Sequence, residues 1–421
     1  MPMDVLLGLQ WGDEGKGKVV DYLAPKYDVV ARFQGGPNAG HTLVHDGVKH
    51  VLHQVPSGIF HSHILNVIGN GVVLDAVVFR READALRARD LDPTQNLVIS
   101  QKAQMIVPTH RLLDAAHEAS KGVNKIGSTL RGIGPAYQDK YARAGLRVGD
   151  LLRPDFDERY KALKESHLAV LNYMGADIAT LPALEEEWMS TLQHLRLFKI
   201  EETEYLLNDA LAAGKEILAE GAQGALLDID FGSYPFVTSS STMTAGACTG
   251  LGVAPKHIRH VYGIFKAYCT RVGSGPFPTE LHDATGEQIR RQGHEFGSTT
   301  GRPRRTGWLD LPALRYACMI SGTTHLLMMK ADVLSGVSDL QVCTHYEQNG
   351  DKTVHFPAGV SEFEAVPIYE TLAGWGQTDG RADWAALPST LQDYVTYIEA
   401  GTELPITMVS LGPDRNETVM R

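Results

Sequence analysis

Six short apolar runs, each followed at once by a polar loop, limit most strongly what this chain can fold into. Near-continuous runs of Val, Ile and Leu are typical of strands covered on both faces, as in parallel sheets. Ligands bind beyond the carboxyl ends of such strands, so the six loops should share one polar site. The runs are VLLGL (5–9), VVARF (29–33), ILNVI (64–68), EILAE (216–220), HLLMMK (325–330) and PITMVS (405–410).

Three segments between these runs show the periodicity of amphipathic helices: residues 112–121, 154–174 and 185–198. No linker, low-complexity tract or fixed-period repeat divides the chain. We therefore predict an α/β fold: a single large domain over residues 1–421, with a mostly parallel central sheet flanked by helices. Helical insertions are expected at about residues 100–200.

Composition argues against several classes of protein. The net charge of −11 disfavours a nucleic-acid partner, which would need a basic surface. No apolar run approaches the roughly 18 residues of a membrane helix, and the start lacks the basic region of an export signal, so no membrane partner and a cytoplasmic location are expected. The four cysteines have no C-x-x-C pair, which favours reduced thiols over disulfides or zinc.

The loop after the first run, GDEGKGKV (12–19), nearly spells a phosphate-binding P-loop. Its glycines let backbone N–H groups approach phosphate oxygens, and Lys16 and Lys18 add positive charge at the start of a helix. Val19, however, stands where a P-loop has the Ser or Thr that holds Mg²⁺. Asp13 can replace that hydroxyl as the metal ligand, or act as a base, or do both.

The second loop, QGGPNAGHT (34–42), ends in His41 after three glycines. Most of the 17 histidines are expected to be solvated or structural. His41 differs by position, because its loop should face the first one, where an imidazole could stabilise or protonate a transferring phosphoryl group.

The residues Lys330-Ala331-Asp332 follow another run and resemble the base-reading element of GTP-binding proteins. A three-residue pattern is weak evidence by itself, and alone it would favour a solvated loop. Together with the phosphate loop, it favours guanine recognition.

Two further segments concentrate positive charge in this acidic chain. GSTTGRPRRTGW (297–308) carries three arginines, whose guanidinium groups can bind carboxylates or phosphates in a bidentate manner. In GIGPAYQDKYARAG (132–145), Lys140 and Arg143 would share a face if both lay on a helix.

These stretches together resemble the adenylosuccinate synthetase family. QWGDEGKGK (10–18) and residues 132–145 are similar to its two signature segments, and QGGPNAGHT, EGAQG, PFVTSS, GPFPTE, TTGRPRRTGW, K-A-D and GPDR follow in the family's order, from residue 4 to about 418. The resemblance implies a homodimeric GTP- and Mg²⁺-dependent ligase that joins IMP and L-aspartate through 6-phosphoryl-IMP, releasing GDP and phosphate.

The resemblance also implies roles for individual residues. Asp13 matches the base and His41 the second catalytic residue, with Mg²⁺ held by Asp13 and Gly40. The residues implied to bind GTP are Gly12, Asp13, Glu14, Gly15, Lys16, Gly17, Lys18, Gly40, His41, Thr42, Arg304, Lys330, Ala331, Asp332, Ser410, Gly412 and Pro413.

The acceptor substrates are assigned in the same way. IMP would contact Asp13, Asn38, Ala39, Thr129, Gln223, Thr238 and Arg302, with Arg143 reaching across from the partner subunit. L-Aspartate would lie against Ser298, Thr299, Thr300, Gly301, Arg302 and Arg304. Leu130 departs from the glycine that is usual in the family.

Two other classes fit less well. A GTPase switch would need a hydroxyl at Val19 and would leave the arginine-rich loop unexplained. A purine-binding protein without catalysis would not need Asp13 and His41 together. A related viral branch of the fold uses dGMP and has a different residue at the position of Asp13. The presence of Asp13 here therefore favours IMP.

Overall fold

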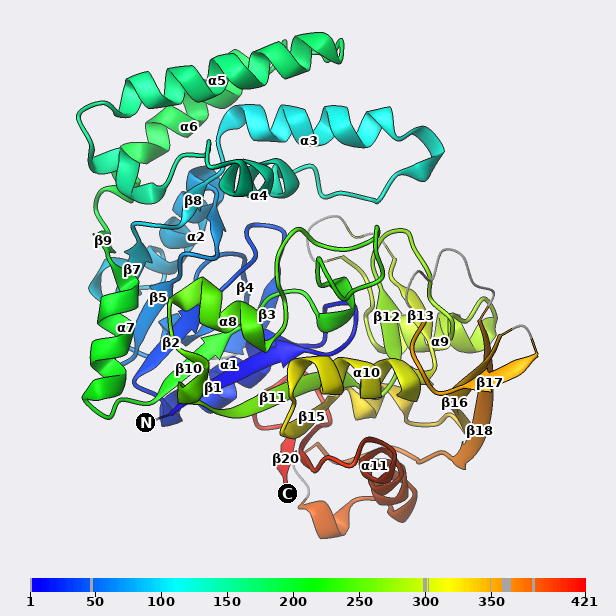
Figure 1. Ribbon diagram of the computed structural model, residues 1–421. Coiled ribbons are helices and arrows are strands. Elements are labelled where there is room, and N and C mark those ends of the chain that lie inside the picture. Colours follow the sequence, from blue (N-terminus) through cyan, green and yellow to red (C-terminus); the bar gives the residue numbers. More distant parts are fainter. Residues whose placement is uncertain are drawn as a thin grey trace.

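A twisted sheet of ten strands crosses the centre of the computed structural model, which describes residues 2–45, 48–297, 301, 303–348, 350–357, 365–380 and 383–421 (Figure 1). Adjacent strands are parallel, except that β20 is antiparallel to β19. In spatial order they are β20 (Thr418–Met420), β19 (Ile406–Ser410), β15 (His325–Met329), β11 (Ile258–Lys266), β1 (Met3–Gly8), β10 (Ile217–Glu220), β2 (Val29–Arg32), β5 (Leu65–Ile68), β7 (Leu97–Ser100) and β9 (Lys199–Glu201).

All six apolar runs are strands of this one sheet: β1, β2, β5, β10, β15 and β19. The predicted fold class is therefore confirmed. The strand β11 was not predicted, because IRHVYGIFK interleaves Arg, His and Gly with its apolar residues and its first half is only partly buried.

The helices pack around this sheet, and the three predicted segments are all helical. They are α3 (Pro108–Ser120), α5 (Phe156–Tyr173) and α6 (Leu181–Leu195). α3 begins earlier than predicted because Pro108 occupies its first turn, where a missing N–H costs nothing. The others are α1 (Lys16–Leu23), α2 (Ala76–Arg87), α4 (Ile133–Ala142), α7 (Thr203–Ala212), α8 (Thr244–Leu251), α9 (Ala284–Gln292), α10 (Leu311–Ser321) and α11 (Ser389–Thr402).

Two groups of elements lie outside the central sheet, at opposite ends of the molecule (Figure 1). The helices α3 to α6 form one group and fall within the predicted insertion, and the sheet of β14 (Leu309–Asp310), β16 (Asp339–Gln348), β17 (Asp351–Thr353) and β18 (Val366–Ala373) forms the other. Three small pairs complete the strands: β3 (His41–His45) with β4 (Val48–Leu52), β6 (Val73–Leu74) with β8 (Gln104–Met105), and β12 (Cys269–Arg271) with β13 (Arg305–Gly307).

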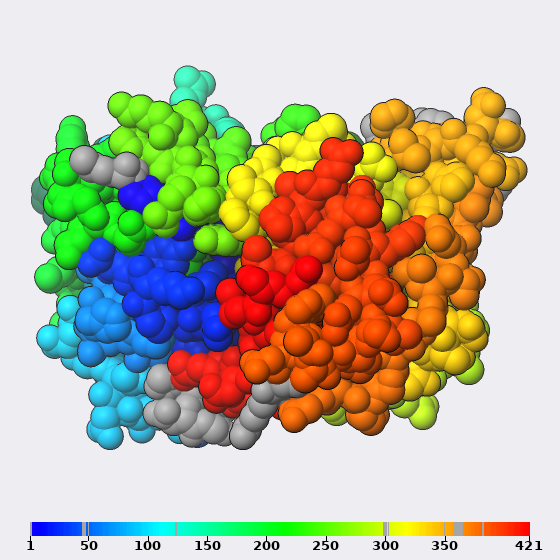
Figure 2. Space-filling view, turned by 90° about the horizontal axis from the view of Figure 1, so that it is seen from below, coloured from blue at the N-terminus to red at the C-terminus, as the bar shows by residue number. Residues whose placement is uncertain are grey.

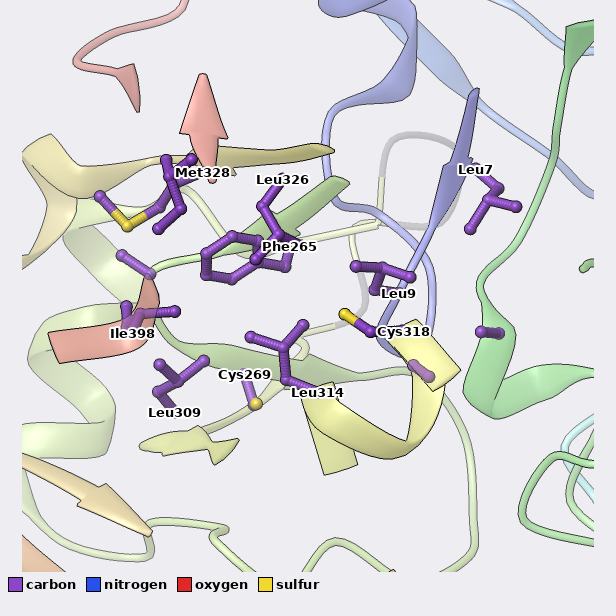
Figure 3. Close-up of a cluster of buried hydrophobic side chains, with 14 of the residues drawn as sticks. Leu7, Leu9, Phe265, Cys269, Leu309, Leu314, Cys318, Leu326, Met328 and Ile398 are labelled. Atoms are coloured by element: carbon purple, nitrogen blue, oxygen red, sulfur yellow. The ribbon is translucent and has the colours of Figure 1, made fainter. Parts of the chain in front are cut away.

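The largest core lies between the middle of the sheet and α10. Figure 3 shows Leu9, Phe265 and Leu326 from the sheet side facing Leu314 and Cys318 of α10. Burying large aliphatic and aromatic side chains stabilises each by about 1.5–3 kcal/mol. This core fixes the carboxyl ends of β1, β11 and β15, from which the predicted site loops start.

Segments from the N-terminal and C-terminal parts of the chain lie side by side in the structure. Figure 2 shows the last residues, in red, packed beside the N-terminal segment, in blue. Loops that are nearly 400 residues apart, near residues 18 and 410, therefore contact each other directly.

The cysteines are unpaired, as predicted: Cys269, Cys318 and Cys343 are buried and Cys248 is half-buried. Among the residues that the structure describes, no helix has the length and apolar character needed to cross a bilayer.

A buried carboxyl at the start of α10 is expected to make stability depend on pH. Asp310 caps α10: its Oδ1 accepts from Ala313 N (3.0 Å) and Tyr346 Oη (2.5 Å). Its Oδ2 is buried and has no hydrogen-bond partner among the described residues. Burial raises the pKa of Asp310 from 3.8 to about 6, because the ionised form loses solvation.

We expect Asp310→Asn to be more stable than the unaltered protein above neutral pH. Because the folded pKa lies above the unfolded one, the carboxyl stabilises the fold most at low pH and loses that contribution as pH rises through about 6. A two-unit shift corresponds to about 3 kcal/mol. Urea unfolding at about pH 5 and about pH 8 covers about one unit of this shift, so it should show a difference of about 1.4 kcal/mol. Asp351→Asn, an exposed change of the same kind, should show none, and equal stability curves for Asp310→Asn and the unaltered protein would contradict the prediction.

Candidate active site

The loop between β1 and α1 turns through three left-handed residues: Gly12 (φ 86°), Asp13 (φ 59°) and Gly15 (φ 97°). Gly15 precedes the first residue of α1, so the backbone N–H groups of that helix start point out of the loop, where an anion can bind. Gly17 lets the helix close on β3, since a Cβ there would lie 3.1 Å from His41 Cβ. The geometry supports the predicted phosphate loop.

Glu14 holds this loop from inside. Its side chain is fully buried, and Oε1 accepts from the backbone N–H groups of Gln10 (3.1 Å) and Gly12 (2.9 Å). Lys16 Nζ lies 2.5 Å from Glu14 Oε2 and neutralises the carboxylate. In this conformation Glu14 fixes the backbone of the loop. A role in GTP binding for Glu14 or Lys16 stays a prediction.

Asp13 points away from that buried network. Its side chain is 38% exposed, and Oδ2 accepts a hydrogen bond from Arg304 Nε at 2.8 Å. Arg304 comes from the arginine-rich segment, just before β13, so the structure joins the candidate base to a residue assigned to both GTP and aspartate. Asp13 Oδ1 takes part in no hydrogen bond within the described part of the chain.

His41 begins β3 and is buried against the end of β10. Its Nδ1 lies 2.5 Å from Oε1 of Glu220, the last residue of β10. Burial lowers the pKa of His41 to about 4, and the charges of Arg32 and Lys16 act in the same direction. His41 Nε2 is buried without a hydrogen-bond partner in the described residues, so it is available to a ligand.

The predicted IMP residues Asn38 and Gln223 are in contact. Gln223 has a left-handed backbone (φ 57°), and its Nε2 donates to Asn38 Oδ1 at 3.3 Å. Its Oε1 is buried and, among the residues described, finds no partner. Arg131 Nη1 donates to Pro37 O (3.0 Å), which brings the loop that carries Thr129 close to Asn38.

The loop of Thr238 reaches the same place. Ser240 Oγ donates to Gln34 Oε1 at 3.0 Å, and Gln34 Nε2 donates to Ala222 O at 2.5 Å. Thr238 is thus held close to the 34–42 loop and to Gln223. Leu130 adopts φ 56° and is 47% exposed, so it keeps the backbone conformation that a glycine would adopt more easily.

The predicted guanine residues lie beyond β15. Lys330 Nζ donates to Gly293 O (2.7 Å) and Glu295 Oε1 (2.8 Å). Burial raises the pKa of Asp332, and its Oδ1 is buried without a partner among the described residues. A Cβ on Gly15 would lie 3.3 Å from Met329 Cε, so the phosphate loop adjoins the end of β15.

Lys18, in the first turn of α1, joins this helix to the loop after β19. Its Nζ donates to Ser410 Oγ (2.7 Å), Gly412 O (2.7 Å) and Glu417 O (3.1 Å). Burial lowers the pKa of Lys18 to about 8, opposed by the nearby carboxylates Glu417 and Asp332. The side chain therefore positions the predicted guanine loop, which sequence reasoning did not anticipate.

Some predicted residues are not brought to this site by the described part of the chain. Arg143 is exposed at the end of α4 with φ 63°, and no hydrogen bond or ion pair between described residues joins it to Asn38 or Gln223. Because α4 ends at Ala142 and Arg143 has a left-handed backbone, the condition for Lys140 and Arg143 to share a helix face is not met. Gly301 is exposed, and Ser298, Thr299, Thr300 and Arg302 lie outside the described residues.

The donors proposed for Mg²⁺ fit that ion. A carboxylate (Asp13) and a backbone carbonyl (Gly40) are hard oxygen ligands, which Mg²⁺ prefers. Only Oδ2 of Asp13 accepts from Arg304, so Oδ1 is left for the ion.

A second group of possible ligands, His110, Asp139 and His167, has its ligand atoms within 4.8 Å of one another. His110 Nδ1 accepts from Val107 N (3.0 Å), so Nε2 carries the proton and donates to Asp139 Oδ2 (2.8 Å). His167 Nε2 donates to the same oxygen (2.9 Å). A metal ion would need the lone pair that the His110 proton occupies, so this group instead fastens α3, α4 and α5 together.

Comparison with known proteins identifies the chain. The fold and the site define a nucleotide-dependent α/β enzyme, and a family model for adenylosuccinate synthetase matches residues 5–419. An adenylosuccinate synthetase from Cytophaga hutchinsonii is 62% identical over 100% of this chain and 98% of its own. The structure of fully ligated adenylosuccinate synthetase from Plasmodium falciparum superposes with a TM-score of 0.93 at 35% identity, covering 99% of each chain.

The chain belongs to the adenylosuccinate synthetase family. It is a GTP-dependent ligase that joins IMP and L-aspartate in the formation of adenylosuccinate, a step of AMP biosynthesis. Succinoaminodeoxyadenylate synthetase of cyanophage S-2L, bound to dGMP and dATP, has a TM-score of 0.64 at 21% identity over 100% of this chain and 95% of its own, and shares the fold.

Proposed function

We propose that the ligation takes place in two steps around Asp13 and His41. Asp13 accepts the N1 proton of IMP, and O6 then attacks the γ-phosphorus of GTP. The bond to the bridging oxygen breaks, its electron pair leaves with GDP, and His41 Nε2 contacts the phosphate. The amine of L-aspartate next attacks C6 of 6-phosphoryl-IMP, and the C6–O6 bond breaks as phosphate leaves.

The position of Asp13 carries this proposal. Its carboxylate lies in the phosphate loop between two left-handed glycines, and Arg304 of the arginine-rich segment donates to it. One side chain thus borders both the nucleotide side and the amino-acid side of the site. When bound, Mg²⁺ would be held by Asp13 and the Gly40 carbonyl and would neutralise phosphate charge.

Unpartnered buried atoms support the substrate assignments. Asp332 Oδ1 suits the N1 and N2 groups of guanine, Gln223 Oε1 suits a donor of IMP, and His41 Nε2 suits a phosphate. Each of these side chains was assigned to that same ligand from the sequence. Other buried atoms of the described residues, such as Asp310 Oδ2, also lack a partner, so the support comes from the match between these three side chains and the ligands assigned to them.

A homodimer with Arg143 contributed to the partner's IMP site is part of the same proposal. The exposed guanidinium of Arg143, outside the site of its own chain, supports this assignment. GTP and IMP are metabolites of the cell interior, which supports a cytoplasmic location. L-Aspartate would bind along residues 298–304, with Arg304 already beside Asp13.

Turnover of GTP by the purified protein tests the proposal. We expect GDP and adenylosuccinate only when IMP, L-aspartate and Mg²⁺ are all present, and rapid GTP hydrolysis without IMP would overturn the ligase assignment. IMP labelled with ¹⁸O at C6 tests the intermediate separately. The label should appear in inorganic phosphate, because O6 leaves bound to the former γ-phosphorus, and its recovery in water would exclude 6-phosphoryl-IMP.

A further inference from the structure

Glu220 holds the Nδ1 side of the His41 ring. It is fully buried at the carboxyl end of β10, and its Oε1 lies 2.5 Å from His41 Nδ1. Although burial alone would raise it, the hydrogen bond from His41, together with the charge of Arg32 and the backbone N–H of Ser57, keeps the pKa of Glu220 below its ordinary value. An ionised carboxylate only accepts, so Nδ1 must donate.

Glu220 is itself fixed on several sides. Ser57 donates from its backbone N to Oε2 (2.8 Å) and from Oγ to Oε1 (2.7 Å). Arg32 Nη1 of β2 lies 3.8 Å from Oε1. With its carboxylate held this firmly, Glu220 sets the direction of the imidazole ring rather than following it.

The opposite ring atom is the one that the proposed reaction uses. A ring that donates from Nδ1 to Glu220 directs Nε2 away from β10, and Nε2 is buried without a described partner. Gly17, in the first turn of the phosphate helix, packs against His41 Cβ and Thr42 O, each 3.1 Å from the position a Cβ would take. The ring therefore stands beside the start of α1, where phosphates are expected.

We infer that Glu220 is a positioning residue, which acts on the reaction by orienting His41 toward the transferring phosphoryl group. This inference rests on the proposed role of His41 and adds a residue to which no role was assigned. A buried carboxylate that merely ties β10 to β3 and residue 57 is the competing interpretation. The two differ in whether the effect of Glu220 passes through His41.

Glu220→Gln tests the inference, because it keeps the size of the side chain and removes its charge. Either orientation of the amide sets its NH₂ group against a donor, Ser57 N–H or His41 Nδ1–H, so the ring loses its fixed direction. We expect kcat to fall about 10-fold to 100-fold while KM for IMP changes less than about twofold. Glu220→Asp, which keeps the charge, should recover part of kcat.

Asp310→Asn is the matched control, since it also exchanges a buried carboxylate for an amide but lies beneath α10. It should keep the kcat of the unaltered enzyme. An equal loss in both variants would assign the effect to general damage and overturn the inference.

A double-mutant cycle with His41→Asn separates the two interpretations directly. If Glu220 acts through His41, adding Glu220→Gln to His41→Asn should lower kcat no further. If the two losses multiply, Glu220 acts independently and the inference fails.

A measurement on the unaltered enzyme needs a variant only to assign the signal. Nitrogen-15 labelled histidine should give a strongly downfield Nδ1–H proton, assigned to His41 by its loss in His41→Asn. Adding GTP with Mg²⁺ should move the Nε2 resonance and leave the Nδ1–H signal in place. Absence of that signal would overturn the inference, whereas an unaltered enzyme that forms no adenylosuccinate would overturn the proposed function instead.

Discussion

Asp13→Asn should abolish ligation while GTP still binds. An amide cannot accept the N1 proton of IMP, so O6 stays a poor nucleophile and the first step stops. General-base catalysis contributes about 10²–10⁴-fold, and the added loss of a carboxylate ligand for Mg²⁺ leads us to expect kcat to fall by at least about 10³-fold, or about 4 kcal/mol of barrier. Asn tolerates left-handed backbone, so the φ of 59° at this position should persist.

Asp90 offers a closely matched control for this variant. It is exposed, lies at the end of α2, and has the same φ of 59° as Asp13. Asp90→Asn therefore makes the same chemical change in the same backbone conformation away from the site, and should ligate normally. Adenylosuccinate formation measures kcat, and calorimetric titration measures GTP binding. Ligation by Asp13→Asn within tenfold of the control would remove Asp13 from the proposed role of base.

Asp332→Asn should change which nucleotide the enzyme uses. A carboxylate accepts from the N1–H and the N2 amino group of guanine, whereas an amide sets its own NH₂ against one of these donors. We expect kcat/KM for GTP to fall about 10²-fold to 10³-fold, since a buried mismatch of this kind costs several kcal/mol. Xanthosine triphosphate carries a carbonyl at C2, which accepts from an amide, so its kcat/KM should rise.

The ratio of kcat/KM for the two triphosphates is the informative quantity, because general damage would lower both together. Asp339→Asn, an exposed change on β16, should leave the ratio unaltered. An Asp332→Asn enzyme that still prefers GTP by the original ratio would show that another group reads the base. Lys330 would then be the candidate, since Glu295 and Gly293 hold its ammonium at the same place.

The sequence was most informative where burial leaves a simple pattern. Strands covered on both faces are almost wholly apolar, and the six runs all proved to be strands of the central sheet. β11 carries Arg259, His260 and Gly263, so its pattern is broken although it pairs with β1 in the middle of the sheet. The order of the strands depends on contacts between distant segments, which no local pattern records.

The sequence predicted which loops lie close together, but not the direction in which each side chain points. All residues of 12–18 were assigned to GTP alike, because a sequence does not say which way each side chain turns. Glu14 faces inward to Gly12 N, and Lys18 faces the C-terminal loop instead of the phosphate loop. Glu220 went unrecognised, since an acid at the end of an apolar run resembles an ordinary strand terminus. Its position before the GAQG loop was the available signal.

The ammonium of Lys18 has a consequence for the order in which the enzyme matures. It joins the first helix to Ser410 and Gly412, so the proposed phosphate loop and the proposed guanine loop are held together by segments nearly 400 residues apart. A polypeptide still emerging from the ribosome has made its phosphate loop long before residue 410 exists. If these loops bind GTP as proposed, such a nascent chain lacks the loop for the base, and capture of GTP has to wait until residues 410–413 have been made.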